Sequence, residues 1–363
     1  MLRFKRLAPL AAAAVLLVAP GCSDSATGPG SVNTTTLLGD VNGLTSTFSA
    51  NAAFQSLATL ANAFPQYAAA AARRALLPAS IGALPAASVG SLQRMLAAVQ
   101  GRRAAVSAIA RAPGAVEALF PIDVLGKTLV WDPDSLKYVV GAGITGAPAT
   151  GIRIRLYTID PNTLEPAAPL TQLGYVDLTD ESTAQANRLG VLLKLGSSTI
   201  ADYTISAIVS TSTEELDAAG YIVAADGTGR VDFDLAETAN LNTNSLHFVY
   251  TLTAQSGAQV LVDLLSNADD TGSATFRISH GGNSIEIDVT GTAAGSSGQV
   301  KFNGVVVATI SGTDTPVFTA VSGHTLSASQ IQDLEDLFVS VGDAVLGVLG
   351  GVFGPAIVVF SGF

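Results

Sequence analysis

The feature that most constrains the fold is a long stretch, residues 230–321, in which apolar and polar residues alternate between glycine-containing turns. Val231, Phe233 and Leu235, for example, are separated from one another by aspartates. Because successive side chains of a strand point to opposite faces, this period of two predicts strands with one buried and one solvated face. Such strands are typical of antiparallel sheets, since parallel sheets covered on both faces give unbroken apolar runs.

Strand patterns of the same kind begin near residue 128. Most connections between them are short and contain Gly, Asn, Asp or Ser, which is typical of successive hairpins in a meander. A sheet with this many strands is expected to curl or to split into packed layers. The predicted strands are residues 128–131, 137–140, 152–159, 174–178, 189–195, 201–209, 221–224, 231–235, 246–253, 259–265, 274–279, 284–290, 299–302, 305–310 and 317–321.

Helical patterns lie on both sides of the strand region. Residues 44–119 are predicted to be an Ala-rich helical segment with thin apolar faces, which needs a partner surface to be stable. Residues 325–363 are predicted to be an apolar helix and tail, with Phe338 in the middle of a broad apolar stripe. The last 20 residues carry no charge and have the length of a membrane span, but five glycines and Pro355 favour a buried helix followed by a short strand, residues 356–360.

The predicted fold is therefore mainly β with α. A large curved antiparallel β-meander, residues 120–324, is expected to be covered on its apolar face by the N-terminal helical segment and by the C-terminal helix. With 363 residues, 48% of them hydrophobic, the chain is long enough to bury such a core.

The charge of the chain is acidic overall and unevenly distributed. Lys and Arg number 18 against 29 Asp and Glu, a net charge of −11, which argues against a nucleic-acid partner. Residues 41–119, in contrast, contain one acid, Glu117, and the arginines Arg73, Arg74, Arg94, Arg102, Arg103 and Arg111. We expect an arginine-bearing helical layer that packs on or near an acidic sheet.

The N-terminus has the organisation of an export signal. A basic start, MLRFKR, is followed by an apolar run from Leu7 to Ala19 that is too short to span a bilayer, and then by Ala19-Pro20-Gly21-Cys22. This arrangement resembles the lipobox of bacterial lipoprotein precursors. The resemblance implies a signal peptide, residues 1–21, and lipidation of Cys22, the only cysteine of the chain. A flexible tether, residues 22–43, a membrane partner through the anchor and an outer-membrane location are expected to follow.

Two motifs could indicate a bound cofactor or metal. Gly141, Gly143 and Gly146 match the spacing of a dinucleotide-binding loop, but residues 148–152 leave no room for the helix that receives the pyrophosphate. A glycine-rich hairpin loop is favoured there. Residues 267–272 begin like a calcium loop, but Ile278 stands where a bidentate glutamate is needed, so an acidic hairpin turn is favoured.

No catalytic constellation is present in the sequence. His247, His280 and His324 are scattered, and neither HExxH nor GxSxG occurs. The group Asp177, Asp180 and Glu181 is interpreted as a solvated turn. We therefore predict no catalytic residue, no cofactor, no metal and no enzymatic activity.

Two classes of function remain. One is a lipid-anchored envelope protein that binds a lipid or another apolar ligand between sheet and helices. The other is a non-enzymatic envelope structural or interaction protein with a fully packed core. The architecture has a loose likeness to the lipoprotein-carrier half-barrels of the bacterial envelope, without a shared residue motif. An apolar cavity between sheet and helices would favour the first class.

Overall fold

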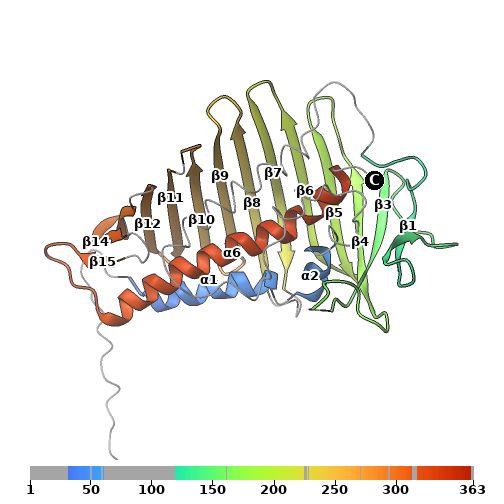
Figure 1. Ribbon diagram of the computed structural model, residues 1–363. Coiled ribbons are helices and arrows are strands. Elements are labelled where there is room, and N and C mark those ends of the chain that lie inside the picture. Colours follow the sequence, from blue (N-terminus) through green and yellow to red (C-terminus); the bar gives the residue numbers. More distant parts are fainter. Residues whose placement is uncertain are drawn as a thin grey trace, which may run out of the picture.

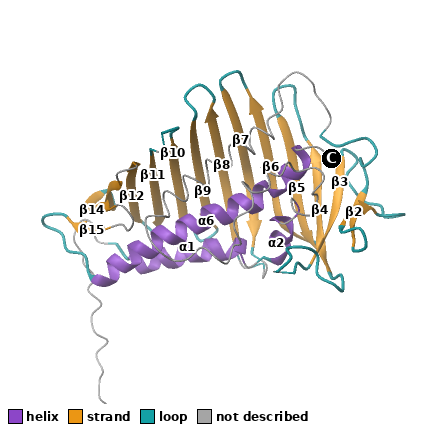
Figure 2. Ribbon diagram, viewed as in Figure 1, coloured by secondary structure: helices purple, strands orange, loops and turns teal. Residues whose placement is uncertain are grey.

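The computed structural model describes residues 32–49, 51–58, 60 and 119–360, apart from residues 161, 225, 226, 228, 270, 293, 294 and 313–316. In this part of the chain the protein is one open, 15-stranded sheet accompanied by a few helices (Figure 1). Figure 2 shows the division into strands and helices. The fold is therefore mainly β, as the sequence predicts.

The strands follow one another across the sheet in the order of the sequence, from β15 back to β3, and then come β1 and β2. Each of the 15 strands predicted between residues 128 and 321 is present. Their bounds are β1 Thr128–Asp132, β2 Lys137–Val140, β3 Gly151–Tyr157, β4 Gln172–Asp180, β5 Asn187–Leu195, β6 Ser198–Val209, β7 Thr213–Val223, β8 Arg230–Asn240, β9 Ser245–Ala254, β10 Gln259–Ser266, β11 Gly272–His280, β12 Asn283–Thr292, β13 Gly295–Phe302, β14 Val305–Gly312 and β15 Val317–Ala320.

Two details of the sheet differ from the prediction. The sheet is mixed rather than purely antiparallel, because β2 folds back on the outer side of β1 and leaves the other side of β1 to pair in parallel with β3. The strands also stay in one open sheet and do not split into two layers. Beyond β1 and β2, neighbouring strands are antiparallel, as expected for a meander.

One face of the sheet is apolar and the other is polar. In β8, for example, Val231, Phe233 and Leu235 are buried while the aspartates between them are exposed. The buried side chains of the strands form one continuous cluster with buried side chains of the helices, such as Leu44, Leu57, Leu337 and Phe353. The sheet and the described helices therefore share a single core.

The described helices are α1 (Thr34–Ser49), α2 (Ala52–Ala58) and α6 (Ala328–Phe360). Asn51 caps α2, because its Oδ1 accepts hydrogen bonds from the amides of Ala53 and Phe54, each at 3.1 Å. At the start of α6, the Ser327 hydroxyl accepts a bond from the Gln330 amide and the Gln330 side chain accepts one from the Ser327 amide. This reciprocal pair is a capping box.

The helices lie against one another, and α1 runs beside α6 (Figure 1). The hydroxyls of Thr34 and Thr35 both donate to Asp333 of α6. Gly351 of α6 lies against the ring of Phe54 of α2. A Cβ added at Gly351 would overlap the two nearest ring atoms and would lie only 3.0 Å from a third. The three helices are thus joined by polar bonds at one end of α6 and by close packing at the other.

Direct hydrogen bonds also connect the helices to the sheet. The Tyr203 hydroxyl donates to the backbone carbonyl of Val352 over 3.1 Å, and the Asn51 amide group donates to the carbonyl of Val223 over 3.2 Å. His280 Nδ1 lies 2.8 Å from Asp40 Oδ2. Because buried polar groups need partners, these bonds fix where the helices can lie relative to β6, β7 and β11.

Two predictions about the ends of the chain are wrong. A tether was expected over residues 22–43, but α1 begins at Thr34, inside that range. A strand was expected over residues 356–360, but α6 continues through Pro355 to Phe360. Pro355 removes one bond of the helical ladder, and the Tyr203 hydroxyl bonds to the neighbouring carbonyl of that turn.

The Ala-rich part of the predicted helical segment, from residue 61 to residue 118, lies outside the described residues, as does the side chain of Phe338. Among the residues that are described, no helix is both long enough and apolar enough to cross a membrane.

Candidate functional site

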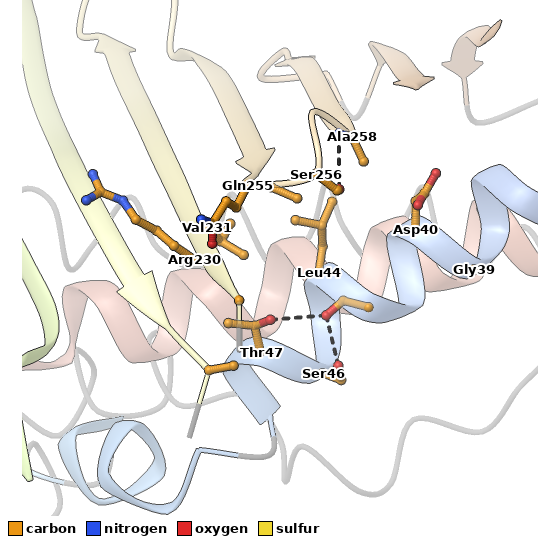
Figure 3. Close-up of a pocket in the computed structure, with 14 residues that line it drawn as sticks. Gly39, Asp40, Leu44, Ser46, Thr47, Arg230, Val231, Gln255, Ser256 and Ala258 are labelled. Atoms are coloured by element: carbon orange, nitrogen blue, oxygen red, sulfur yellow. Dashed lines mark hydrogen bonds between the residues drawn. The ribbon is translucent and has the colours of Figure 1, made fainter. Parts of the chain in front are cut away.

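A groove of about 700 Å³ lies where α1 meets one end of the sheet. Its walls are α1, the turn between β7 and β8, and the turn between β9 and β10 (Figure 3). The volume falls within the range of about 300–1,000 Å³ that is usual for small-molecule sites. The groove therefore lies between a helix and the sheet, where the sequence predicts a ligand.

Two glycines leave the helical wall of the groove bare. Gly39 and Gly43 are four residues apart on α1, so they lie on the same face of the helix. A Cβ added at either position would meet no atom within 4 Å. The absence of side chains at these two positions is thus what keeps this side of the groove open.

The floor of the groove is apolar. Leu44 of α1, Val231 of β8 and Ala258 line it and are themselves buried. The nearby hydroxyls of Ser46 and Thr47 donate to the carbonyl of Gly43, at 2.8 Å and 3.1 Å. Their donors are therefore satisfied within the helix and are not directed at a ligand.

The charged residues of the groove are also engaged elsewhere. The guanidinium of Arg230 points away from α1 in Figure 3. It bonds to Asp232, with Nε 2.9 Å from Oδ1, and lies 3.8 Å above the ring of Tyr221. The carboxylate of Asp40 is bound to His280. The groove consequently offers apolar surface without a free charge directed into it, which suits an apolar chain better than an anionic or cationic group.

The glycine-rich loop is not the hairpin loop that the sequence predicts, because β1 lies between β2 and β3 in the sheet and these two strands do not pair with each other. Gly141, Gly143 and Gly146 lie between β2 and β3, and no helix intervenes before β3 begins at Gly151. Gly143 and Gly146 have φ of 70° and 100°, which glycine adopts without steric cost. The loop therefore lacks the helix N-terminus on which a pyrophosphate would be bound.

The turn between β10 and β11 is an acidic hairpin turn. The Asp269 carboxylate accepts bonds from the hydroxyl of Thr271, at 2.6 Å, and from its amide, at 3.2 Å. The Thr271 side-chain bond, followed by the backbone bond, lowers the pKa of Asp269. The carboxylate of Asp269 thus stabilises the turn through hydrogen bonds within it, as in an Asx turn.

The remaining titratable candidates are dispersed. His247 pairs with Asp263 across two strands of the polar face, whereas His280 bonds to Asp40 at the end of the sheet. Asp177 is bound bidentately by Arg153, at 2.7 Å and 2.8 Å. Asp180, in contrast, accepts the amide of Leu119. Within the described part of the chain, no three metal-ligating side chains gather in one place.

The groove itself was not predicted, and Cys22, the predicted lipidation site, lies outside the described residues. The only sequence signal for the groove is the pair Gly39 and Gly43, at a spacing that places both on one side of a helix. That signal was missed because residues 22–43 were interpreted as tether.

No protein-family model matches the chain, and neither a curated protein nor a solved structure is significantly similar to it.

Proposed function

We propose that this protein is a lipid-anchored protein of the bacterial cell envelope that binds a lipid or another apolar chain in the groove beside α1. The observation that carries the binding proposal is the groove itself, which combines an apolar floor, a wall bared by two glycines and charged neighbours that are already paired. The described residues that line the groove include no constellation suited to catalysis, and we propose a non-enzymatic role.

The anchor and the groove are close together in the chain. Between Cys22, the proposed lipidation site, and α1 there are only residues 23–33, which span at most about 40 Å when fully extended. Gly39 is then less than two helical turns into α1. An anchored molecule would therefore hold its groove near the lipid surface, where an apolar ligand could be taken up or delivered.

We further propose that the helices cover the apolar face of the sheet. The support comes from the shared core, in which Leu57 and Leu337 are buried together with strand residues, and from the bond between Tyr203 and Val352. An apolar sheet face of this size requires such a cover.

The binding proposal is tested by mass spectrometry of lipids that co-purify with protein lacking residues 1–31. The decisive variant is Gly43→Leu, which places a side chain in the groove at a position where an added Cβ meets no atom within 4 Å. It also replaces glycine by a better helix former, so loss of stability is not expected. Thr36→Leu is the matched control, because it adds the same side chain to an exposed position of α1 outside the lining.

We expect a bound lipid in the parent and in Thr36→Leu, and its loss in Gly43→Leu. If no lipid co-purifies with the parent and it also fails to bind a fluorescent fatty-acid analogue, the binding proposal is wrong. The second candidate function, a structural or interaction protein, would then be favoured. Its support is the tightly packed apolar face, where residues such as Ile154, Leu193 and Leu235 are completely buried.

A further inference from the structure

Two turns of the protein are built alike, and each ends on an exposed leucine. Residues 132–136 and 160–164 share one sequence pattern, in which Asp-Pro is followed by Asp or Asn, then by Ser or Thr, and then by Leu. In both turns the carboxylate of the first aspartate accepts a bond from the amide two residues later, at 3.1 Å and 2.8 Å. The first turn joins β1 to β2, and the second lies between β3 and β4.

The two leucines hold a backbone conformation that does not suit them. Leu136 has a φ of 50° and Leu164 has a φ of 59°. Gly, Asn and Asp are favoured in this left-handed region, whereas a bulky residue is an outlier there. Burial does not explain the choice of leucine, since the two residues are 54% and 39% exposed. Strain that persists without a packing reason is a sign of function.

Both turns lie at the end of the sheet that carries the groove. β1 is parallel to β3, and from β3 to β10 each strand is antiparallel to the next. The β1–β2 and β3–β4 connections therefore leave the same end of the sheet as the β7–β8 and β9–β10 turns, which are walls of the groove. Helix α1 lies along this end (Figure 1). At the usual strand spacing, about 24 Å separates β3 from β8.

This end of the sheet presents apolar and small residues rather than basic ones. A third exposed leucine, Leu170, lies in the β3–β4 connection. The β5–β6 turn consists of Gly196 and Ser197, which bring neither a charge nor a large side chain. Residues 132–137 and 160–165 contain four acids and one base, so the surroundings of the leucines do not attract an anionic surface.

We propose that Leu136, Leu164 and Leu170 insert into the surface of a lipid bilayer and give the protein a second membrane contact, which turns the groove toward the lipid. The occupant is a zwitterionic lipid surface, because it accepts apolar side chains without requiring positive charge. The lipid approaches from this side because the chain leads from the proposed anchor at Cys22 directly into α1. The inference rests on the proposed function for this direction of approach, but not on a ligand in the groove.

The test uses residues 22–363 with Cys22→Ser, a chain without any cysteine. An N-terminal histidine tag attaches it to phosphatidylcholine vesicles that contain a nickel-chelating lipid, so the result does not depend on lipidation. An environment-sensitive fluorophore is attached to Thr163→Cys, beside Leu164. Thr243→Cys is the matched control, because Thr243 is also exposed in a turn but lies at the opposite end of the strands. Brominated phosphatidylcholine quenches a fluorophore that contacts the lipid.

We expect quenching at residue 163 and not at residue 243. Replacement of both Leu136 and Leu164 by Asn should lower the equilibrium constant for lipid contact, obtained from the quenched fraction, at least about tenfold. The melting temperature should not fall, because Asn adopts a positive φ readily. Retention of stability together with loss of contact distinguishes a membrane role of the leucines from a structural one.

The proposal is overturned if the two positions are quenched equally or if neither is quenched, and the second result would favour a protein partner for the leucines. It is also overturned if the double Asn variant is quenched as strongly as the parent, or if that variant melts at a lower temperature. Quenching that requires phosphatidylglycerol would likewise contradict it, since attraction to anionic lipid would then replace apolar insertion. Failure of Cys22 lipidation or of ligand binding in the groove would leave all of these results unchanged.

Discussion

The contact between α2 and α6 can be tested by adding a single methyl group. Gly351→Ala is expected to destabilise the protein, although alanine is ordinarily the better helix residue. The helix preference alone would add about 1 kcal/mol to the free energy of unfolding. This gain is opposed by a steric overlap between the new Cβ and the ring of Phe54. The Cβ would overlap the two nearest ring atoms and would lie only 3.0 Å from a third. Carbon atoms in good contact are about 3.5–4.0 Å apart, so the ring or the helix must move.

Overpacking of this kind costs about 1–3 kcal/mol, and a value toward the upper end is expected here because the overlapped ring of Phe54 is itself buried. The expected net loss is therefore about 1–2 kcal/mol in the free energy of unfolding. Phe54→Leu should relieve most of the overlap, so the double variant should lose less than the sum of the two single variants. Urea unfolding measures these differences, provided that the m-value stays constant.

Gly43→Ala is the matched control, because the added methyl group there meets no atom within 4 Å. This variant should gain about 0.5–1 kcal/mol from helix preference alone. If Gly351→Ala proves as stabilising as Gly43→Ala, the close approach of α6 to Phe54 is wrong, and with it the position of the C-terminal half of α6.

Two further predictions concern the anchor and the polar face. Cys22→Ser should release the protein from membranes, measured by fractionation of cells, because the lipid anchor would be lost; a variant that stays bound would place the anchor elsewhere. Asp217→Asn should raise the melting temperature at pH 7 and leave it almost unchanged at pH 3. Burial first, and then repulsion from Glu215 and Asp234, raise the pKa of Asp217, so the protein loses stability as the pH rises through the titration of this carboxyl group. An equal gain at both pH values would contradict that origin.

The strands could be predicted from the sequence because alternation of polarity directly reports a half-buried sheet. The prediction failed only locally, where burial and polarity disagree. In β7 the sequence predicts residues 221–224, but the strand begins at Thr213. The missed part of the strand has Glu214 on the apolar face and Ala218 where a larger apolar residue is usual. The alternation of apolar and polar residues therefore cannot be recognised in the sequence of this part.

The helices were less predictable because their boundaries depend on tertiary contacts. The run of Ile357, Val358, Val359 and Phe360 has strand propensity, yet it is helical, because packing overrides such preferences. Residues 34–43 are polar enough to resemble a tether, but Asn33 caps a helix there through the amide of Thr36. The groove depends on the distance between α1 and the β7–β8 and β9–β10 turns. This distance cannot be predicted from a local sequence pattern.

The polar contacts of the helices divide the apolar face into two halves with different chemistry. The contacts of α1, α2 and α6 with the sheet run through Asp40–His280, Asn51–Val223 and Tyr203–Val352, all toward the end that carries the groove. The carboxylates of Glu214 and Glu237 lie toward the other end, and none of these helices carries a cation. Helices without positive charge suit the end of the sheet that carries the groove, where a neutral ligand is proposed to bind.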